Sequence, residues 1–281
     1  MESDVFADAA RVILRNSLYQ LVFTVGLIAA VGLVVGLLNR AFYRAVGYRF
    51  GRGVCIATGF IGVPVHEIGH ALFCIVFGHR IVEMRLYQPN NADGTLGYVN
   101  HMYNRRNIYH QIGNFFIGFG PILFGSATLL LLMVALVPDL FGAFRDSSDF
   151  SDIPDMDVFS LSALRRIFDV MRGASVAFYS ASRINDWRWW VFMIPACSIA
   201  LHMSLSVADI KSSRIGFGFI VVTLLIVNTV LYLVGTGMVS ALTNHSLVAG
   251  AFILNFLTIS VVFSLILLLF GIIAGVIMRV R

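Results

Sequence analysis

Charged residues, and glutamate above all, are scarce in this sequence. Glu2, Glu67 and Glu83 are its only glutamates, and 12% of the 281 residues are charged, about half the share found in soluble domains. Hydrophobic residues make up 58% of the chain, and the mean hydropathy is +0.86. So little charge cannot cover a water-exposed surface of this size. The composition therefore predicts a protein that needs lipid as its solvent.

Cysteine is also scarce, and repeats or low-complexity tracts are missing. Cys55, Cys74 and Cys197 all fall in apolar segments, so no disulfide framework is predicted. The net charge of +5 would suit nucleic acid in a soluble protein. Here the basic residues lie mostly beside apolar segments, where anchoring at the membrane surface explains them. We therefore predict a lipid bilayer as partner and no nucleic acid.

Long apolar stretches are what the sequence has instead. A helix needs about 20 residues to cross the hydrocarbon core. Six stretches are long enough, near 18–38, 54–78, 112–137, 189–209, 215–238 and 248–278. The first is too long for a cleavable signal peptide, and no small-residue cleavage site follows it. The predicted fold is an all-α, multi-pass membrane protein with about six transmembrane helices.

Two polar regions interrupt the apolar stretches. Residues 80–101 alternate apolar and polar side chains around the turn-rich PNNADG, which predicts a small membrane-associated β-hairpin. The longer loop 138–188 has an acidic beginning, followed by apolar residues at helical spacing with arginines opposite, which predicts a helix in the membrane interface. When this long loop is discounted, the distribution of Lys and Arg favours both termini in the cytoplasm.

The chemistry is concentrated in His66-Glu67-Ile68-Gly69-His70, an HExxH motif inside the second stretch. Residues four apart lie on one face of a helix, so the two imidazoles can bind one Zn²⁺. Glu67 can then act as general base on a zinc-bound water. Ionisable groups at the centre of a span cost roughly 2.5–3.5 kcal/mol each on insertion scales. We expect a ligand to compensate that cost, although a polar patch bonded to neighbouring helices is the alternative.

A catalytic zinc takes a third protein ligand, and elimination points to Asp209. Position 76, where a third histidine could follow, is Val76, and Glu83 lies in the predicted hairpin. Asp209 closes the polar-containing stretch 189–209, although it could instead be a helix-end carboxylate near Lys211. His202 lies seven residues earlier on the same predicted helical face. It could be a supporting residue or an alternative ligand, but we expect a hydrogen bond between helices instead.

These residues resemble the site-2 protease family of intramembrane metalloproteases. The resemblance rests on HEIGH in an early span, on Gly120-Pro121 in the next span and on Asp209 in a later one, and it covers about 40% of the chain. It implies three core helices that bind zinc through His66, His70 and Asp209, with Glu67 catalytic. The sequence Val-Ala-Asp-Ile around Asp209 departs from the family's usual Asp-Gly.

The resemblance also divides the chain and suggests where a substrate binds. Residues 1–53 would form an N-terminal segment, 54–214 the metalloprotease core and 215–281 two C-terminal helices. An exposed strand can bind an extended peptide by adding it to the sheet. The residues predicted to contact the substrate are Thr95, Leu96, Gly97, Tyr98 and Asn114, although Asn114 could instead bond two helices together.

The predicted function is hydrolysis of peptide bonds in or near transmembrane segments of membrane-protein substrates. One alternative is a membrane-embedded zinc protease that cuts soluble or lipidated peptides. The other is a zinc-binding membrane protein without catalysis, such as a transporter or scaffold. A transporter should distribute its ligands along a pathway through several spans, whereas here the candidates cluster on two.

Overall fold

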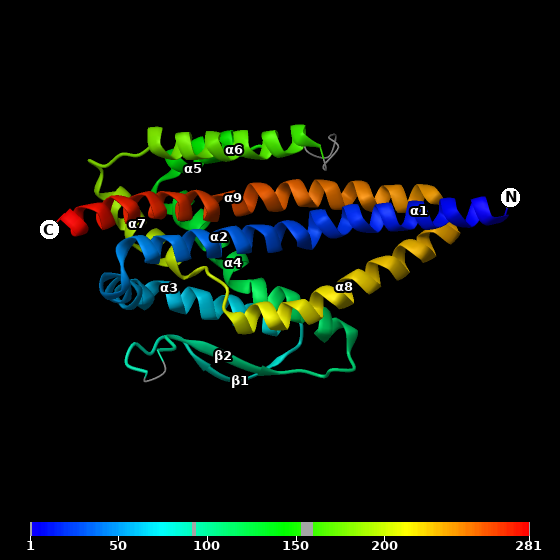
Figure 1. The fold of residues 1–281 in the computed structure, drawn as a ribbon, viewed down its shortest axis with the longest axis horizontal. Coiled ribbons are helices and arrows are strands. Elements are labelled where there is room, and N and C mark those ends of the chain that lie inside the picture. The colour runs from blue at the N-terminus through cyan, green and yellow to red at the C-terminus, as the bar shows by residue number, and fades with distance from the viewer. Residues whose placement is uncertain (1, 92–93, 153–159, 281) are drawn as a thin grey trace.

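The computed structural model describes residues 2–91, 94–152 and 160–280, which form a helical bundle with one two-stranded sheet (Figure 1). Residues 92–93 of the predicted hairpin and 153–159 of the predicted polar loop lie outside the described residues. The elements in chain order are α1 (Glu2–Leu21), the π-helical turn η1 (Val22–Gly26), α2 (Leu27–Val46), α3 (Tyr48–Val76), β1 (Arg80–Arg85), β2 (Tyr98–Met102), α4 (Ile108–Leu136), α5 (Pro138–Ser147), α6 (Leu161–Ser180), α7 (Trp187–His202), α8 (Val207–Val234) and α9 (Thr236–Val280).

Helices long and apolar enough to cross a membrane confirm a multi-pass helical membrane protein, but they number five among the described residues rather than the six predicted. They are Phe6–Val46, Phe50–Val76, Ile108–Leu136, Val207–Val234 and Thr236–Met278. The first combines α1, η1 and α2 into one long segment. The prediction that fails is the fourth span, 189–209.

That stretch is two helices rather than one. Helix α7 has 16 residues and ends at His202, short of the roughly 20 that a crossing takes. Helix α8 begins after Ser206, whose side chain accepts a hydrogen bond from the Asp209 backbone N–H at 3.1 Å. Asp209 therefore lies in the first turn of α8, and its predicted position on one helical face with His202 is wrong.

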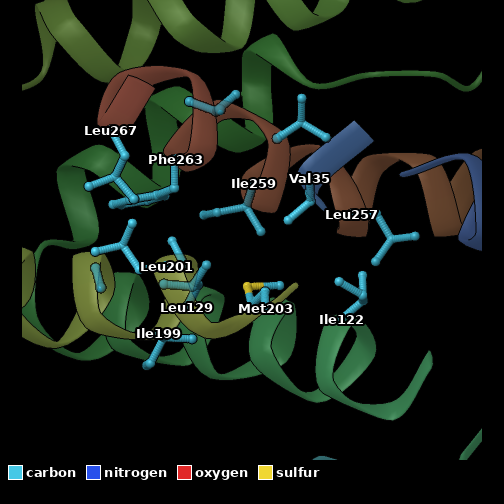
Figure 2. Packing of buried hydrophobic residues seen from close by; sticks show 14 of the residues in the cluster. Val35, Ile122, Leu129, Ile199, Leu201, Met203, Leu257, Ile259, Phe263 and Leu267 are labelled. Atoms are coloured by element: carbon cyan, nitrogen blue, oxygen red, sulfur yellow. The ribbon is translucent and has the colours of Figure 1, made fainter. Parts of the chain in front are cut away.

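The apolar core forms where α2 and α9 meet α4 and α7. The segment α1–η1–α2 and helix α9 run side by side along the long axis of the molecule (Figure 1). Figure 2 shows Val35 of α2 and Phe263 of α9 facing Leu129 of α4 and Ile199 of α7. All four side chains are at most 2% exposed. This core holds α4 and α7 in the positions from which their backbones reach the site described below.

The predicted β-hairpin is confirmed, as an antiparallel pair of β1 and β2 on the α3 side of the bundle (Figure 1). Ile81 pairs with His101 and Arg85 with Tyr98, with a bulge between Ile81 and Glu83. Ile81 and His101 are half-buried, whereas Glu83 and Asn100 are exposed; the bulge shifts the alternation in β1, so that Met84 rather than Glu83 is the next half-buried residue after Ile81. The hairpin thus directs one face of β2 toward the helices.

The polar region 138–188 contains two described helices, α5 and α6. Leu161, Phe168 and Val176 of α6 are 62%, 68% and 58% exposed, as expected for a helix with an apolar face against lipid. The two ends of the chain lie at opposite ends of the long axis (Figure 1). Which membrane side holds each end, and the cytoplasmic location of both, remain predictions. Helix α8 runs unbroken across the predicted domain boundary at 214/215.

Candidate metal centre

His66, His70 and Asp209 converge at the junction of α3 with α8. Their ligand atoms all lie within 4.8 Å of one another, and they are the group that could hold a metal ion in the part of the chain described. The two Nε2 atoms are 3.2 Å apart, and His70 Nε2 is 3.4 Å from Asp209 Oδ1. The structure therefore brings together the three ligands predicted from sequence.

The ring of His70 is oriented by a carbonyl that Pro121 leaves unpaired. Proline has no backbone N–H, so Pro121 cannot bond to the carbonyl four residues earlier in α4, which belongs to Ile117. His70 Nδ1 donates to that Ile117 oxygen at 2.7 Å. A carbonyl oxygen can only accept, so the proton of neutral His70 is on Nδ1 and its Nε2 lone pair faces His66 and Asp209.

The ring of His66 is oriented in the same way by the end of another helix. The last carbonyls of a helix have no intrahelical partner, and His202 is the last residue of α7. His66 Nδ1 donates to the His202 backbone oxygen at 2.6 Å. The His66 proton is thus on Nδ1 as well, which leaves its Nε2 lone pair directed at the same point.

Asp209 is fixed by the N-terminus of α8. Ser206 and Asp209 form a reciprocal capping box, in which the Ser206 backbone N–H donates to Asp209 Oδ2 at 2.7 Å. That bond leaves Oδ1 toward His70. One oxygen of the carboxylate therefore holds the helix start, while the other faces the histidines.

This donor set fits a zinc ion. Bonds of about 2.0–2.1 Å in tetrahedral geometry separate ligand atoms by roughly 3.3 Å, close to the observed 3.2 and 3.4 Å. Two imidazole lone pairs and a carboxylate oxygen this close repel one another unless a cation lies between them. Nitrogen and oxygen ligands of this kind are those that zinc takes in catalytic sites.

Glycines let the three helices approach closely enough. A Cβ on Gly69, inside the HEIGH motif, would lie 2.8 Å from the Gly120 carbonyl oxygen, and one on Gly120 would lie 2.6 Å from that of Gly69. A Cβ on Gly118 would meet the Asp209 carbonyl oxygen at 2.7 Å. Helix α4 thus packs backbone to backbone against both helices that carry ligands.

Glu67 is 5% exposed and borders a cavity of about 460 Å³ that also reaches the three ligands. The hairpin forms its other wall. A Cβ on Gly97 would lie 2.9 Å from Glu67 Oε1, so the backbone at Gly97 contacts the carboxylate. The lining residues are His66, Glu67, His70, Thr95, Gly97, Tyr98, Val99, Asn100, His101, Ile117, Gly118, Ser206, Ala208, Asp209 and Ser212.

The remaining predicted residues divide between this cavity and other places. Thr95, Gly97 and Tyr98 line it, whereas Leu96 lines a neighbouring cavity with Tyr43 and Arg52. Asn114 is fully buried, and its amide oxygen accepts from the Ser212 hydroxyl at 3.3 Å. It therefore acts as a link between α4 and α8 rather than as part of the wall.

His202 supports the site through its backbone rather than through its ring. Its Nε2 lies 3.1 Å from the Thr58 hydroxyl on α3, while its carbonyl oxygen accepts from His66. The contact with Thr58 is the expected hydrogen bond between helices, and the His202 ring lies outside the group of possible metal ligands.

Sequence reasoning missed the backbone groups at Ile117 and Ser206. The signal for Ser206 is present, because Ser-Val-Ala-Asp fits the S-x-x-D pattern of a capping box. The Ile117 carbonyl could be inferred from Pro121, four residues later, once α4 is known to pack against HEIGH. His101 was also missed as a cavity residue.

Comparisons with known proteins give no relative on which to base an identification. No family model, curated protein or solved structure matches this chain.

Proposed function

We propose that this protein is an intramembrane zinc metalloprotease that hydrolyses peptide bonds in or near transmembrane segments. The observation that carries the proposal is the pairing of two features in one cavity. Three ligand atoms converge with both imidazole lone pairs directed inward, and a buried Glu67 carboxylate lies beside them. A binding site without catalysis has no need of that carboxylate.

Each residue has a defined task in this proposal. His66, His70 and Asp209 would hold zinc, which when bound polarises a carbonyl and makes water nucleophilic near neutral pH. Glu67 accepts the proton of the attacking water and then donates it to the leaving amine. Because Gly97 has no side chain, its backbone lies against Glu67, and the wall formed by β2 can pair with a substrate in extended form.

A substrate helix in the membrane must unwind before it is cut, because its peptide groups are otherwise not accessible to Glu67 and the bound zinc. In a helix the backbone groups are already hydrogen-bonded, whereas an extended chain exposes them to the wall of the cavity. Substrates with small or helix-breaking residues near the cut would unwind most easily. We therefore propose a membrane-protein or peptide substrate that enters the cavity locally extended.

Glu67→Gln is the deciding variant, since it removes the base but none of the three ligands. Wild-type and variant proteins would be expressed in parallel, their metal measured by elemental analysis, and new N-termini in the host membrane proteins identified by mass spectrometry. We expect equal zinc, near one per chain, and termini that appear only with wild type. Cleavage that persists in Glu67→Gln would overturn the proposal.

The same experiment separates the alternatives. Stoichiometric zinc without any Glu67-dependent cleavage would favour a non-catalytic zinc-binding protein. Glu67-dependent cuts confined to soluble or lipidated peptides would favour the other class of membrane-embedded protease. Asp209→Ala should lower zinc content, whereas His202→Ala, which keeps its backbone carbonyl, should not.

A further inference from the structure

Three histidines gather where the hairpin joins the helices, outside the metal ligands. His79 follows α3, His101 lies in β2 and His110 is in the first turn of α4. His79 is 5% exposed and its ring stacks on Tyr103 at 4.7 Å between centroids. His101 also lines the cavity that contains Glu67.

Two hydrogen bonds fix which ring nitrogens carry protons. His79 Nε2 donates to the His110 backbone oxygen at 2.9 Å, because a carbonyl can only accept. Neutral His79 then has a lone pair on Nδ1, which lies 3.0 Å from His101 Nδ1. The proton between them must belong to His101. His101 therefore carries its proton on Nδ1 and has an unprotonated Nε2.

The surroundings keep both rings neutral. Burial lowers the pKa of His79 below its ordinary value. Burial, followed by the nearby His79 and His70, lowers the pKa of His101 to about 4. His101 thus donates from Nδ1 to His79, and His79 donates from Nε2 to the His110 carbonyl. The remaining ring nitrogen of His101, Nε2, can only accept a hydrogen bond.

We propose that His101 is a substrate-positioning residue, whose Nε2 accepts a hydrogen bond from a backbone N–H of an extended peptide in the cavity. This role rests on the proposed proteolysis. Since Nδ1 is engaged by His79, the acceptor that His101 can offer is Nε2, on the opposite edge of the ring. The backbone of a peptide has one kind of donor, the N–H, so a fixed acceptor selects peptide chains by their backbone. It would set the register of the chain relative to Glu67.

A first test reads the protonation of His101 directly and needs no substrate. Full-length protein labelled with ¹⁵N-histidine, in lipid nanodiscs with zinc bound, would be studied by solid-state NMR. His101 and His79 should show opposite patterns, with the unprotonated nitrogen at Nε2 in His101 and at Nδ1 in His79. A proton on His101 Nε2 would overturn the inference whatever the protein's activity.

A second test replaces His101 by Asn or by Gln, whose side-chain amides reach opposite edges of the space that the imidazole ring occupies. In His101→Asn the amide replaces Nδ1 and keeps the contact with His79, but no acceptor remains at the Nε2 position. In His101→Gln the amide reaches that position. Both would be made in the inactive Glu67→Gln protein, and the affinity of a fluorescent apolar peptide rich in alanine and glycine would be measured.

Loss of one neutral hydrogen bond should weaken peptide binding roughly fivefold in His101→Asn, with recovery in His101→Gln. A series of peptides, each with one N–H replaced by an ester oxygen, should show one position at which the replacement weakens binding to the protein that has His101. The same replacement should not weaken binding to the His101→Asn protein. In the active protein His101→Asn should raise KM by a similar factor and change kcat little. Unchanged affinity in His101→Asn, or no measurable peptide binding, would overturn the positioning role.

The two proposals fail in different ways. If wild type cleaves the peptide and His101→Asn matches its KM, the protease function stands and the role of His101 falls. If the peptide binds with the expected dependence on His101 but no Glu67-dependent cleavage occurs, the catalytic proposal falls instead. Amide exchange in β2 serves as the check that His101→Asn leaves the hairpin docked.

Discussion

Pro121 makes the Ile117 carbonyl available to His70, which donates to it at 2.7 Å from Nδ1. A proline that would elsewhere only weaken a membrane helix here provides the acceptor that orients a metal ligand. The relationship ties the Gly-Pro sequence of α4 to the HExxH motif of α3 through one hydrogen bond.

Pro121→Ala should weaken zinc binding. The new N–H of residue 121 can bond to the Ile117 oxygen and compete with His70, and loss of such supporting bonds costs about tenfold or more in metal affinity. Competition with a zinc chelator measures the change. Pro195→Ala is the matched control in α7, because the carbonyl four residues before it, at Val191, contacts none of the ligands in any described bond. Equal affinity in both variants would contradict the interpretation.

Ser206→Ala should destabilise α8 and loosen Asp209. The lost cap costs about 1 kcal/mol of stability. The Asp209 carboxylate keeps its bond from the backbone N–H of residue 206, but the reciprocal bond from the Asp209 N–H, which helps to fix the first turn of α8, is lost. Ser160 caps α6 in the same way, accepting from Ala163 N–H at 3.2 Å, but lies away from the site. Ser160→Ala should therefore lower the melting temperature similarly and leave chelator-measured zinc affinity intact. A comparable drop in affinity for both variants would show that Ser206 acts only through stability.

Gly69→Ala should separate α3 from α4. The added Cβ would meet the Gly120 oxygen at 2.8 Å, and overpacking of this kind costs about 1–3 kcal/mol. Gly53 lies in the same helix with nothing within 4 Å of an added Cβ, so Gly53→Ala should be neutral or slightly stabilising. Thermal unfolding in detergent with zinc present compares the two. A Gly69→Ala protein as stable as Gly53→Ala would rule out the close helix contact.

Acid should release the hairpin from the helices. His101 has a pKa of about 4 in the folded protein against an ordinary 6.5, so the undocked hairpin binds more protons between these values. Docking is therefore fully stable above about pH 6.5 and weakens progressively as the pH falls toward 4. Hydrogen exchange of the β2 amides, corrected for the intrinsic pH dependence, should increase in that window. His101→Asn should remove most of this dependence, and an unchanged dependence would point to another group.

Local sequence patterns predicted the parts of the site that depend on local geometry. Helical periodicity places His66 and His70 on one face, and strand alternation in 80–101 gives the hairpin. Asp209 could be found by elimination because acidic residues are so rare in this chain. These inferences need only the spacing of residues within one element.

The break between α7 and α8 could not be read from hydropathy, because the residues on both sides of it are apolar. Only the Ser206 to Asp209 spacing marks a helix start, and that signal is weaker than a continuous apolar run. The sequence left Asn114 open between substrate contact and helix–helix bonding, because which side of α4 faces α8 depends on the packing of Gly118 of α4 against Asp209 and of Gly216 of α8 against Phe115. Such contacts between distant elements have no local signature.

The three ligands are held by main-chain groups at positions 117, 202 and 206. A main-chain carbonyl or amide is supplied by almost any amino acid, so the identity of the side chains at Ile117 and His202 carries little information about the site. Because Ile117 is also buried, saturation mutagenesis should find other apolar side chains tolerated there, whereas proline at 206, which lacks the N–H, should be excluded. The architecture can therefore persist through extensive sequence drift, provided that HExxH, the aspartate, the helix breaks, the glycines at the helix contacts and Pro121 remain.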